Sequence, residues 1–185
     1  MNREYDLHLP LKSKSKGRGD SFFPRIKEEY LFRLNPHWIV NDFSCSDSSY
    51  SVEIVDHETE VSRILTGLYS ANAEGFPTIS ADGCEWQSIR FFLKNGSLHA
   101  EIIYQEEPEE EVERKMVLWL RAVKEYLRLY SEDTLYTRFF RMLMNRVILP
   151  MTPSQRKISL MLIRITILEL LIIVVIIVGW FFFFR

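Results

Sequence analysis

The feature that most constrains the fold of this chain is an apolar stretch at its C-terminus. Residues 165–184 read ITILELLIIVVIIVGWFFFF, and Arg185 follows. About 20 residues of helix, at ~1.5 Å each, cross the roughly 30 Å hydrocarbon core of a bilayer. A helix pairs its own backbone groups, so an isolated segment crosses lipid in this form. The sequence therefore predicts a tail-anchored membrane protein with a single transmembrane helix within residues 158–185.

Basic residues lie directly before this predicted span. No acidic residue occurs between Asp133 and Glu169. Because cytoplasmic flanks of membrane helices carry an excess of Lys and Arg, we expect the N-terminal part of the chain in the cytoplasm. The N-terminal residues have no apolar core of signal-peptide length, which agrees with that location. The basic residues expected to contact the membrane or a partner are Arg138, Arg141, Arg146, Arg156, Lys157 and Arg164.

Charged and aromatic residues also lie within the apolar stretch. Arg164 is expected to reach the headgroups and mark the cytoplasmic edge. Glu169 lies about 7 Å deeper by helix rise, where a carboxylate is costly. It could be protonated, paired with Arg164, or paired with a group on a neighbouring membrane subunit, which is the interpretation we favour. Trp180 is expected at the far interface, where the aromatic surface would contact lipid, or a quinone or pigment held by another subunit.

Two interpretations remain open for the basic segment before the span. Residues 134–149 combine apolar side chains with arginines and contain no acid. A helix of this kind could lie in the headgroup zone, or it could pack on the soluble domain or a partner subunit. Pro150 and Pro153 predict a break and a short linker. We therefore expect residues 132–157 to form a basic amphipathic helix and linker near the membrane.

Residues 1–131 are expected to form one soluble cytoplasmic domain. Its clearest local signal is Asn95-Gly96 between two strand-like runs, 86–94 and 97–105, which predicts a type I′ hairpin. Further strands are expected over 5–11, 51–55 and 61–69, with a helix as the alternative for the last of these. A helix over 22–34 and a basic loop over 12–20 complete the predicted elements.

A long amphipathic helix follows the hairpin. Val112, Met116, Val123 and Leu127 recur at helical spacing, and Pro108 with its acidic neighbours suits a helix start. The apolar face of this helix needs a cover, and the preceding sheet is the obvious candidate. The expected fold class is therefore α+β, an antiparallel sheet covered by a long amphipathic helix and followed by one transmembrane helix.

Charge, cysteines and histidines predict no catalytic residue and no metal site. The net charge of −2 gives no argument for a nucleic-acid partner. Cys45 and Cys84 lack metal-ligand spacing and are expected to be reduced. The local trio of Asp56, His57 and Glu58 suits an ordinary turn better than an acid–base or metal site. The lack of hydrolase, zinc-protease and redox motifs favours binding or scaffolding over catalysis.

The element order and the segment VERKMVLWLRAVKEYLRLY, residues 112–130, resemble the helix-grip fold of the START-like superfamily. That superfamily contains lipid-transfer proteins, polyketide cyclases and aromatic-ligand-binding proteins, and the resemblance covers about residues 1–130. It implies an apolar ligand held between the curved sheet and the long helix, whereas a filled core made of the same side chains is the alternative. The implied cavity lining is Trp86, Phe92, Tyr104, Trp119 and Val123.

Two functions from different classes follow. The first is an accessory or structural subunit whose cytoplasmic domain docks on a larger membrane protein complex, with the bilayer and other integral membrane subunits as partners. The alternative is a membrane-tethered helix-grip protein that binds or carries an apolar small molecule or lipid. A sensor of anionic lipid signals through the basic loop at residues 12–18 is a more distant third. No nucleic-acid partner and no resident cofactor are predicted.

Overall fold

The computed structural model describes residues 1–10, 27–71, 76–131 and 134–183. The chain divides into two compact units, Met1–Pro150 and Met151–Arg185. The basic loop predicted over 12–20, the start of the helix predicted over 22–34 and the final two residues lie outside the described part. The segment predicted over 132–157 is shared between the two units.

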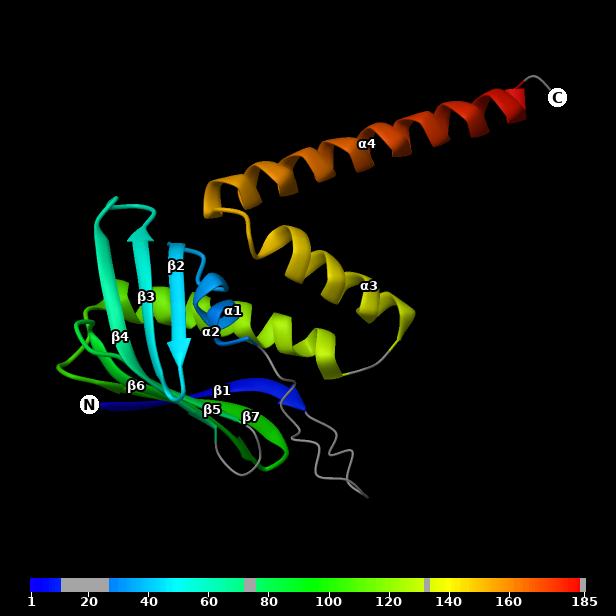
Figure 1. The fold of residues 1–185 in the computed structure, drawn as a ribbon. Coiled ribbons are helices and arrows are strands. Elements are labelled where there is room, and N and C mark those ends of the chain that lie inside the picture. Colours follow the sequence, from blue (N-terminus) through cyan, green and yellow to red (C-terminus); the bar gives the residue numbers. More distant parts are fainter. Residues whose placement is uncertain (11–26, 72–75, 132–133, 184–185) are drawn as a thin grey trace. The chain divides into compact units, whose positions relative to one another are not determined.

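One seven-stranded antiparallel sheet forms the frame of the first unit (Figure 1). Its strands are β1 (Asn2–Pro10), β2 (Trp38–Ser46), β3 (Ser49–Asp56), β4 (Ser62–Ala71), β5 (Pro77–Ser80), β6 (Trp86–Lys94) and β7 (Ser97–Tyr104). Their order is β1-β7-β6-β5-β4-β3-β2, so the first strand pairs with the last and forms one edge. Pro10 ends this edge strand, in agreement with the rule that confines proline to sheet edges.

The predicted hairpin is confirmed. β6 and β7 pair antiparallel around Asn95 and Gly96, whose φ angles of 54° and 76° are both positive, as a type I′ turn requires. The strand interpretation of residues 61–69 is also confirmed, since β4 pairs with β3 from Ser62 to Leu68 and with β5 from Tyr69 onward. On β7 every second residue is buried, and these residues are Leu98, Ala100, Ile102 and Tyr104.

β4 passes very close to the residue that ends β5. A Cβ atom placed on Gly67 would lie 1.9 Å from the carbonyl oxygen of Ser80. Two hydrogen bonds fix this approach, because Tyr50 Oη donates to the Ser80 carbonyl at 2.7 Å and the Leu68 amide donates to Ser80 Oγ at 3.0 Å. Glycine is the one residue type that leaves room for the two backbones here.

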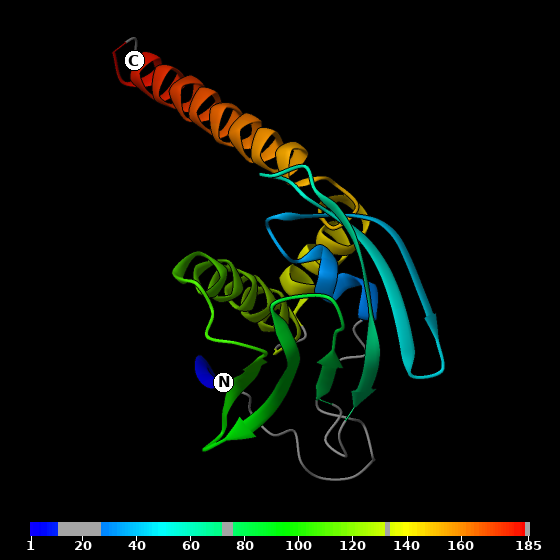
Figure 2. The same ribbon diagram turned by 90° about the vertical axis from the view of Figure 1, so that its left-hand side faces the viewer.

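The predicted long helix is α2 (Glu110–Ser131), which lies along one face of the sheet (Figures 1 and 2). The indole Nε1 of Trp119 donates to the Leu31 carbonyl of the short helix α1 (Glu28–Arg33) at 2.7 Å. Ion pairs hold α2 to β1 through Arg3 and Glu113, 2.6 Å apart, and to the β3–β4 turn through Lys115. The buried face of α2 is Met116, Trp119, Leu120, Val123, Tyr126 and Leu127, so the predicted α+β fold class is confirmed.

Two further helical elements complete the first unit. Thr134 caps α3 (Leu135–Leu143), because its side chain accepts a hydrogen bond from the Thr137 amide while the Thr137 side chain bonds back. A π-helical turn, η1 (Met144–Ile148), continues it. Asn145 of this turn accepts a hydrogen bond from Tyr126 Oη at 2.8 Å, which joins the turn to α2.

The second unit is the helix α4 (Pro153–Phe183). Its start corrects the predicted linker over residues 151–157, since the helix begins at Pro153 rather than near Ile158. The physical reason is a capping pair in which the Thr152 amide donates to Gln155 Oε1 at 2.9 Å and the Gln155 amide donates to Thr152 Oγ1 at 3.3 Å. Proline suits the first helical position, where an N–H has no partner within the helix.

Candidate functional site

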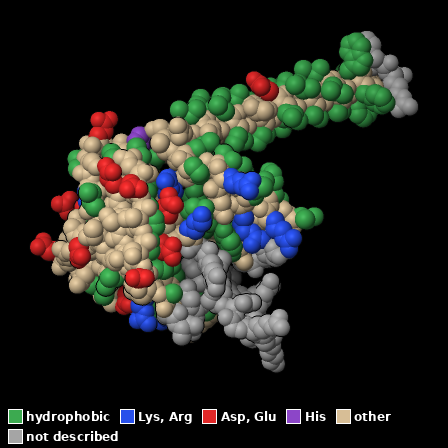
Figure 3. All heavy atoms as spheres, viewed as in Figure 1, with side chains coloured by type: hydrophobic (Ala, Val, Ile, Leu, Met, Phe, Trp, Pro, Cys, Tyr) green, Lys and Arg blue, Asp and Glu red, His purple; other side chains and the backbone are tan. Residues whose placement is uncertain are grey.

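α4 presents apolar side chains along its length, as Figure 3 shows. By length and composition it could cross a membrane, so the predicted span is a helix of the required kind. Glu169 and Arg164 are both exposed on it, and Trp180 retains 64% of its surface. Arg156 bonds through Nε to the Met151 carbonyl at 3.0 Å, and Lys157 is exposed in the next position.

The side chains of α3 divide into an exposed apolar face and a face that contacts the domain. Leu135, Tyr136, Phe139 and Met142 are exposed by 85%, 68%, 54% and 50% respectively. Lys and Arg side chains gather over the same region in Figure 3. The predicted basic residues Arg138, Arg141 and Arg146 belong to α3 and η1.

The opposite face of α3 and η1 packs on α2. The Arg141 guanidinium lies 5.1 Å from the centroid of the Tyr130 ring, and Asn145 Nδ2 donates to Tyr130 Oη at 3.2 Å. Met144 packs against the apolar core, and Leu149 is fully buried. The interpretation in which this segment packs on the soluble domain therefore describes one of its faces, and the other face is exposed in the described part of the chain.

The interior between the sheet and α2 holds four of the five residues proposed for a ligand cavity. Trp86, Tyr104 and Trp119 are each 1% exposed and Val123 is fully buried, all within one apolar cluster. The ring centroids of Trp86 and Trp119 are 6.1 Å apart. Burial of this kind agrees with the filled-core alternative, and ligand binding there stays a prediction.

Phe92 does not belong to that interior, which corrects the predicted lining. Its ring stacks on His99 at 5.7 Å, on the opposite face of the sheet. The cause is a bulge in β6, where Trp86 pairs with Tyr104 but Ser88 pairs with Ile103. The extra residue reverses the alternation, so that Phe91 and not Phe92 shares the buried face with Trp86.

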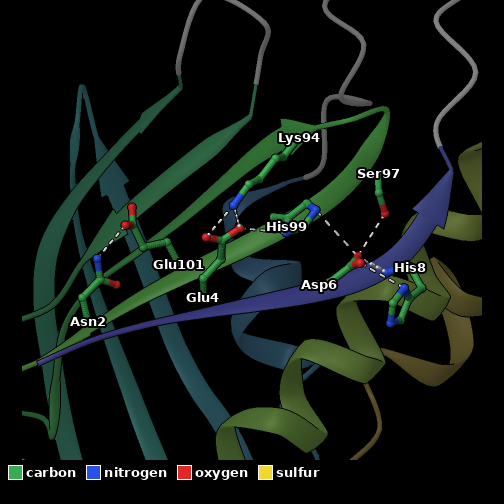
Figure 4. Close-up of polar contacts among 8 residues, drawn as sticks. All are labelled: Asn2, Glu4, Asp6, His8, Lys94, Ser97, His99 and Glu101. Carbon is green, nitrogen blue, oxygen red and sulfur yellow. Dashed lines mark hydrogen bonds and ion pairs between the residues drawn. The ribbon is translucent and has the colours of Figure 1, made fainter.

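A polar cluster lies on this opposite face, where β1, β7 and β6 meet (Figure 4). Lys94 Nζ donates to both oxygens of Glu4, at 2.6 and 2.9 Å. His99 lies between two carboxylates, with Nδ1 3.0 Å from Glu4 Oε1 and Nε2 3.8 Å from Asp6 Oδ1. The cluster was not predicted from the sequence. It depends on the pairing of β1 with β7, which are neighbours in the sheet but lie almost a whole domain apart along the sequence.

The hydrogen bonds and ion pairs of the cluster suit a role in holding β1 to β6 and β7, rather than nucleophilic catalysis. Ser97 Oγ donates to Asp6 Oδ1 at 3.0 Å, so its hydroxyl proton points to a carboxylate and not to a histidine base. The hydrogen bond from Lys94 holds the pKa of Glu4 below its usual value. The amide of His8 does the same for the pKa of Asp6, and both carboxylates stay anionic at neutral pH.

The predicted interpretation of Asp56, His57 and Glu58 as a turn is confirmed. Asp56 Oδ1 accepts hydrogen bonds from the Glu58 amide at 2.9 Å and the Thr59 amide at 3.0 Å. Burial opposes ionisation of Asp56, but these bonds and nearby Lys115 outweigh it and hold its pKa below the usual value. Among the described residues, no group of three or more His, Cys, Asp or Glu could hold a metal ion.

No family model and no curated protein matches the chain. Among solved structures, the AHSA1-like protein from Aeromonas hydrophila is similar, with 10% identity, a TM-score of 0.44, and coverage of 72% of this chain and 97% of that one. A protein from Cytophaga hutchinsonii is similar over 56% of this chain and 74% of its own, with 15% identity and a TM-score of 0.35. At these identities and TM-scores, the two similarities carry no argument about superfamily or activity.

Proposed function

We propose that this protein is a single-pass membrane protein whose helix-grip domain, on the cytoplasmic side, is an accessory subunit of a larger membrane protein complex. The observation that carries the proposal is Glu169 on the apolar surface of α4. A charged side chain at membrane depth costs about 3 kcal/mol on insertion scales, so such residues usually have a partner. A neighbouring membrane subunit would supply that partner.

Arg164 is poorly placed to be the partner of Glu169. The two residues are five positions apart, which is about 140° around a helix of 3.6 residues per turn. In the described part of the chain Glu169 makes no ion pair. A hydrogen-bond donor or a basic group on another helix is therefore the contact that this carboxylate fits.

Purification of the full chain in mild detergent tests the proposal. We expect other integral membrane proteins to co-purify in fixed stoichiometry, and to be lost with Glu169→Leu. Leu170→Ala, a change at the adjacent exposed position, is the matched control and should retain them. A monodisperse monomer from the unmodified chain, or partner binding that is unchanged in Glu169→Leu, would refute the proposal.

A membrane-tethered carrier of an apolar small molecule is the second candidate function. Its basis is the resemblance to the helix-grip fold, which would place the ligand between the sheet and α2, beside Trp86, Tyr104 and Trp119. Lipid extraction and mass spectrometry of the purified full chain should then find a bound apolar molecule in a constant ratio. A bound lipid, quinone or pigment at α4 would be lost with Trp180→Ala, whereas one held in the domain would be retained.

A further inference from the structure

We propose that α3 is a membrane-surface helix that lies in the headgroup layer of an anionic leaflet and holds the domain against the bilayer. The proposal rests on the membrane anchor of the proposed function and adds a second, lateral contact with lipid. It assigns the exposed face of α3 to a lipid surface rather than to a protein.

The exposed residues of α3 form one continuous apolar stripe. Leu135, Tyr136, Phe139 and Met142 follow the spacing i, i+1, i+4 and i+7, which places them on one side of a helix. All four are at least half exposed. Contiguous apolar patches on a soluble surface mark contact sites, since isolated exposed residues are normal but stripes are not.

The other side of α3, together with η1, is already occupied. Tyr126 and Tyr130 of α2 contact Asn145, and Arg141 covers the ring of Tyr130. α3 therefore cannot turn its apolar stripe into the domain without breaking these contacts. The stripe is presented outward as a fixed part of the domain surface.

Charge selects an anionic lipid surface as the occupant. From Thr134 to the end of η1 there are three arginines and no acidic residue. Arg138 lies one helical turn from both Leu135 and Met142, at the edge of the stripe. Arg146 is exposed in η1. An apolar face flanked by cationic side chains is the pattern of helices that lie at the lipid interface, where each Lys or Arg near the surface adds about 1 kcal/mol.

The length of the connecting chain also favours lipid. η1 ends at Ile148 and α4 begins at Pro153. The four residues between them make five Cα–Cα steps, which reach at most roughly 18 Å when extended. The C-terminal end of η1 is therefore tethered within that distance of the start of α4, so a bilayer that α4 crosses is kept near α3.

Spin labels on the full chain reconstituted into vesicles test this placement. Cys45→Ser removes the exposed cysteine, while buried Cys84 stays unlabelled. Nitroxides are then placed by Phe139→Cys, by Glu107→Cys as an aqueous reference, and by Leu168→Cys as a membrane reference. Collision with oxygen, which concentrates in lipid, is compared with collision with a water-soluble nickel chelate in phosphatidylcholine vesicles with and without phosphatidylglycerol.

We expect the label at 139 to collide preferentially with oxygen, as the label at 168 does, when phosphatidylglycerol is present. Arg146→Glu changes the local charge by two units. At about 1 kcal/mol per charge, we expect the ratio of protein with the label at 139 in the membrane to protein with that label in water to fall about 30-fold. Arg146→Lys keeps the charge and should retain the insertion.

A label at 139 that behaves like the one at 107 would overturn the proposal. So would a label shielded from both reagents, which would mean that a protein partner covers the stripe. Insertion that is equal in phosphatidylcholine vesicles would overturn the role given to the arginines. The proposed function is tested separately, because Glu169→Leu should abolish partner binding without changing the depth of the label at 139.

Discussion

Gly67→Ala tests the most demanding packing feature of the sheet. The new methyl group would lie 1.9 Å from the Ser80 carbonyl oxygen, 2.8 Å from its carbonyl carbon and 3.0 Å from Ala81 Cα. Carbon and oxygen atoms that are not bonded need more than 3 Å, so one backbone has to move by over an ångström. All three obstructing atoms are backbone, and no side-chain rotation relieves the contact.

The expected loss of unfolding free energy follows from three terms. Overpacking of a methyl group costs about 1–3 kcal/mol. Moving Ser80 also weakens the hydrogen bonds that it makes with Tyr50 and Leu68, each worth about 1 kcal/mol. The lower unfolded-state entropy of alanine returns roughly 0.4–1 kcal/mol. We expect a net loss of about 3 kcal/mol, or a fall in Tm of roughly 6–12 °C for a unit of this size.

Thermal and urea unfolding of the full chain in detergent, followed by near-UV circular dichroism, measures this loss. Thr66→Ala, on an exposed neighbour in the same strand, is the control and should change stability by less than about 0.5 kcal/mol. Gly67→Ala combined with Ser80→Gly should stay destabilised, because the obstruction is the backbone. Stability of the Gly67→Ala variant within 0.5 kcal/mol of the unmodified chain would refute this account.

Two further predictions concern the sheet face and its ion pairs. Phe91→Ala should lower the unfolding free energy by about 3–5 kcal/mol, because Phe91 is buried, and Phe92→Ala by about 1 kcal/mol or less. Urea titrations measure both losses, and equal losses would contradict the bulge that places the two side chains on opposite faces. Because the folded-state pKa of Asp56 is lowered, its contribution is present above the unfolded pKa near 4 and is lost as pH falls through the lower folded value. Asp56→Asn keeps the acceptor oxygen for the turn but loses the charge beside Lys115. We therefore expect the variant to be less stable at pH 7 and its stability to depend less on pH below about 5. If circular dichroism gives the same dependence of stability on acid pH for both proteins, the contribution given to the Asp56 charge is wrong.

Local signals in the sequence were sufficient for the elements whose geometry is local. Asn95-Gly96 requires positive φ at two successive residues, and no distant contact changes that requirement. The apolar spacing of α2 likewise identified its buried face, from Met116 to Leu127. The choice between strand and helix at residues 61–69 was open, because only pairing with β3 distinguishes them.

Features that depend on distant partners were not predictable in the same way. The bulge after Trp86 reverses the faces of the strand, so Phe92, which the resemblance implied for the cavity lining, lies on the other side of the sheet. The ionic cluster needed the knowledge that β1 lies beside β7. The start of α4 was missed because Pro153 was interpreted as a break, although Thr152 and Gln155 together make it a helix start.

The pairing of β1 with β7 has a consequence for how the domain is made. β1 leaves the ribosome first, yet Asn2 bonds to Glu101, 99 residues later in the chain. At roughly 5–20 residues per second, that partner is translated about 5–20 s afterwards. Throughout this interval the apolar residues Leu7 and Leu9 lack the partners that bury them in the folded domain. The nascent chain therefore exposes an apolar, unpaired strand that chaperones could bind before β7 pairs with it.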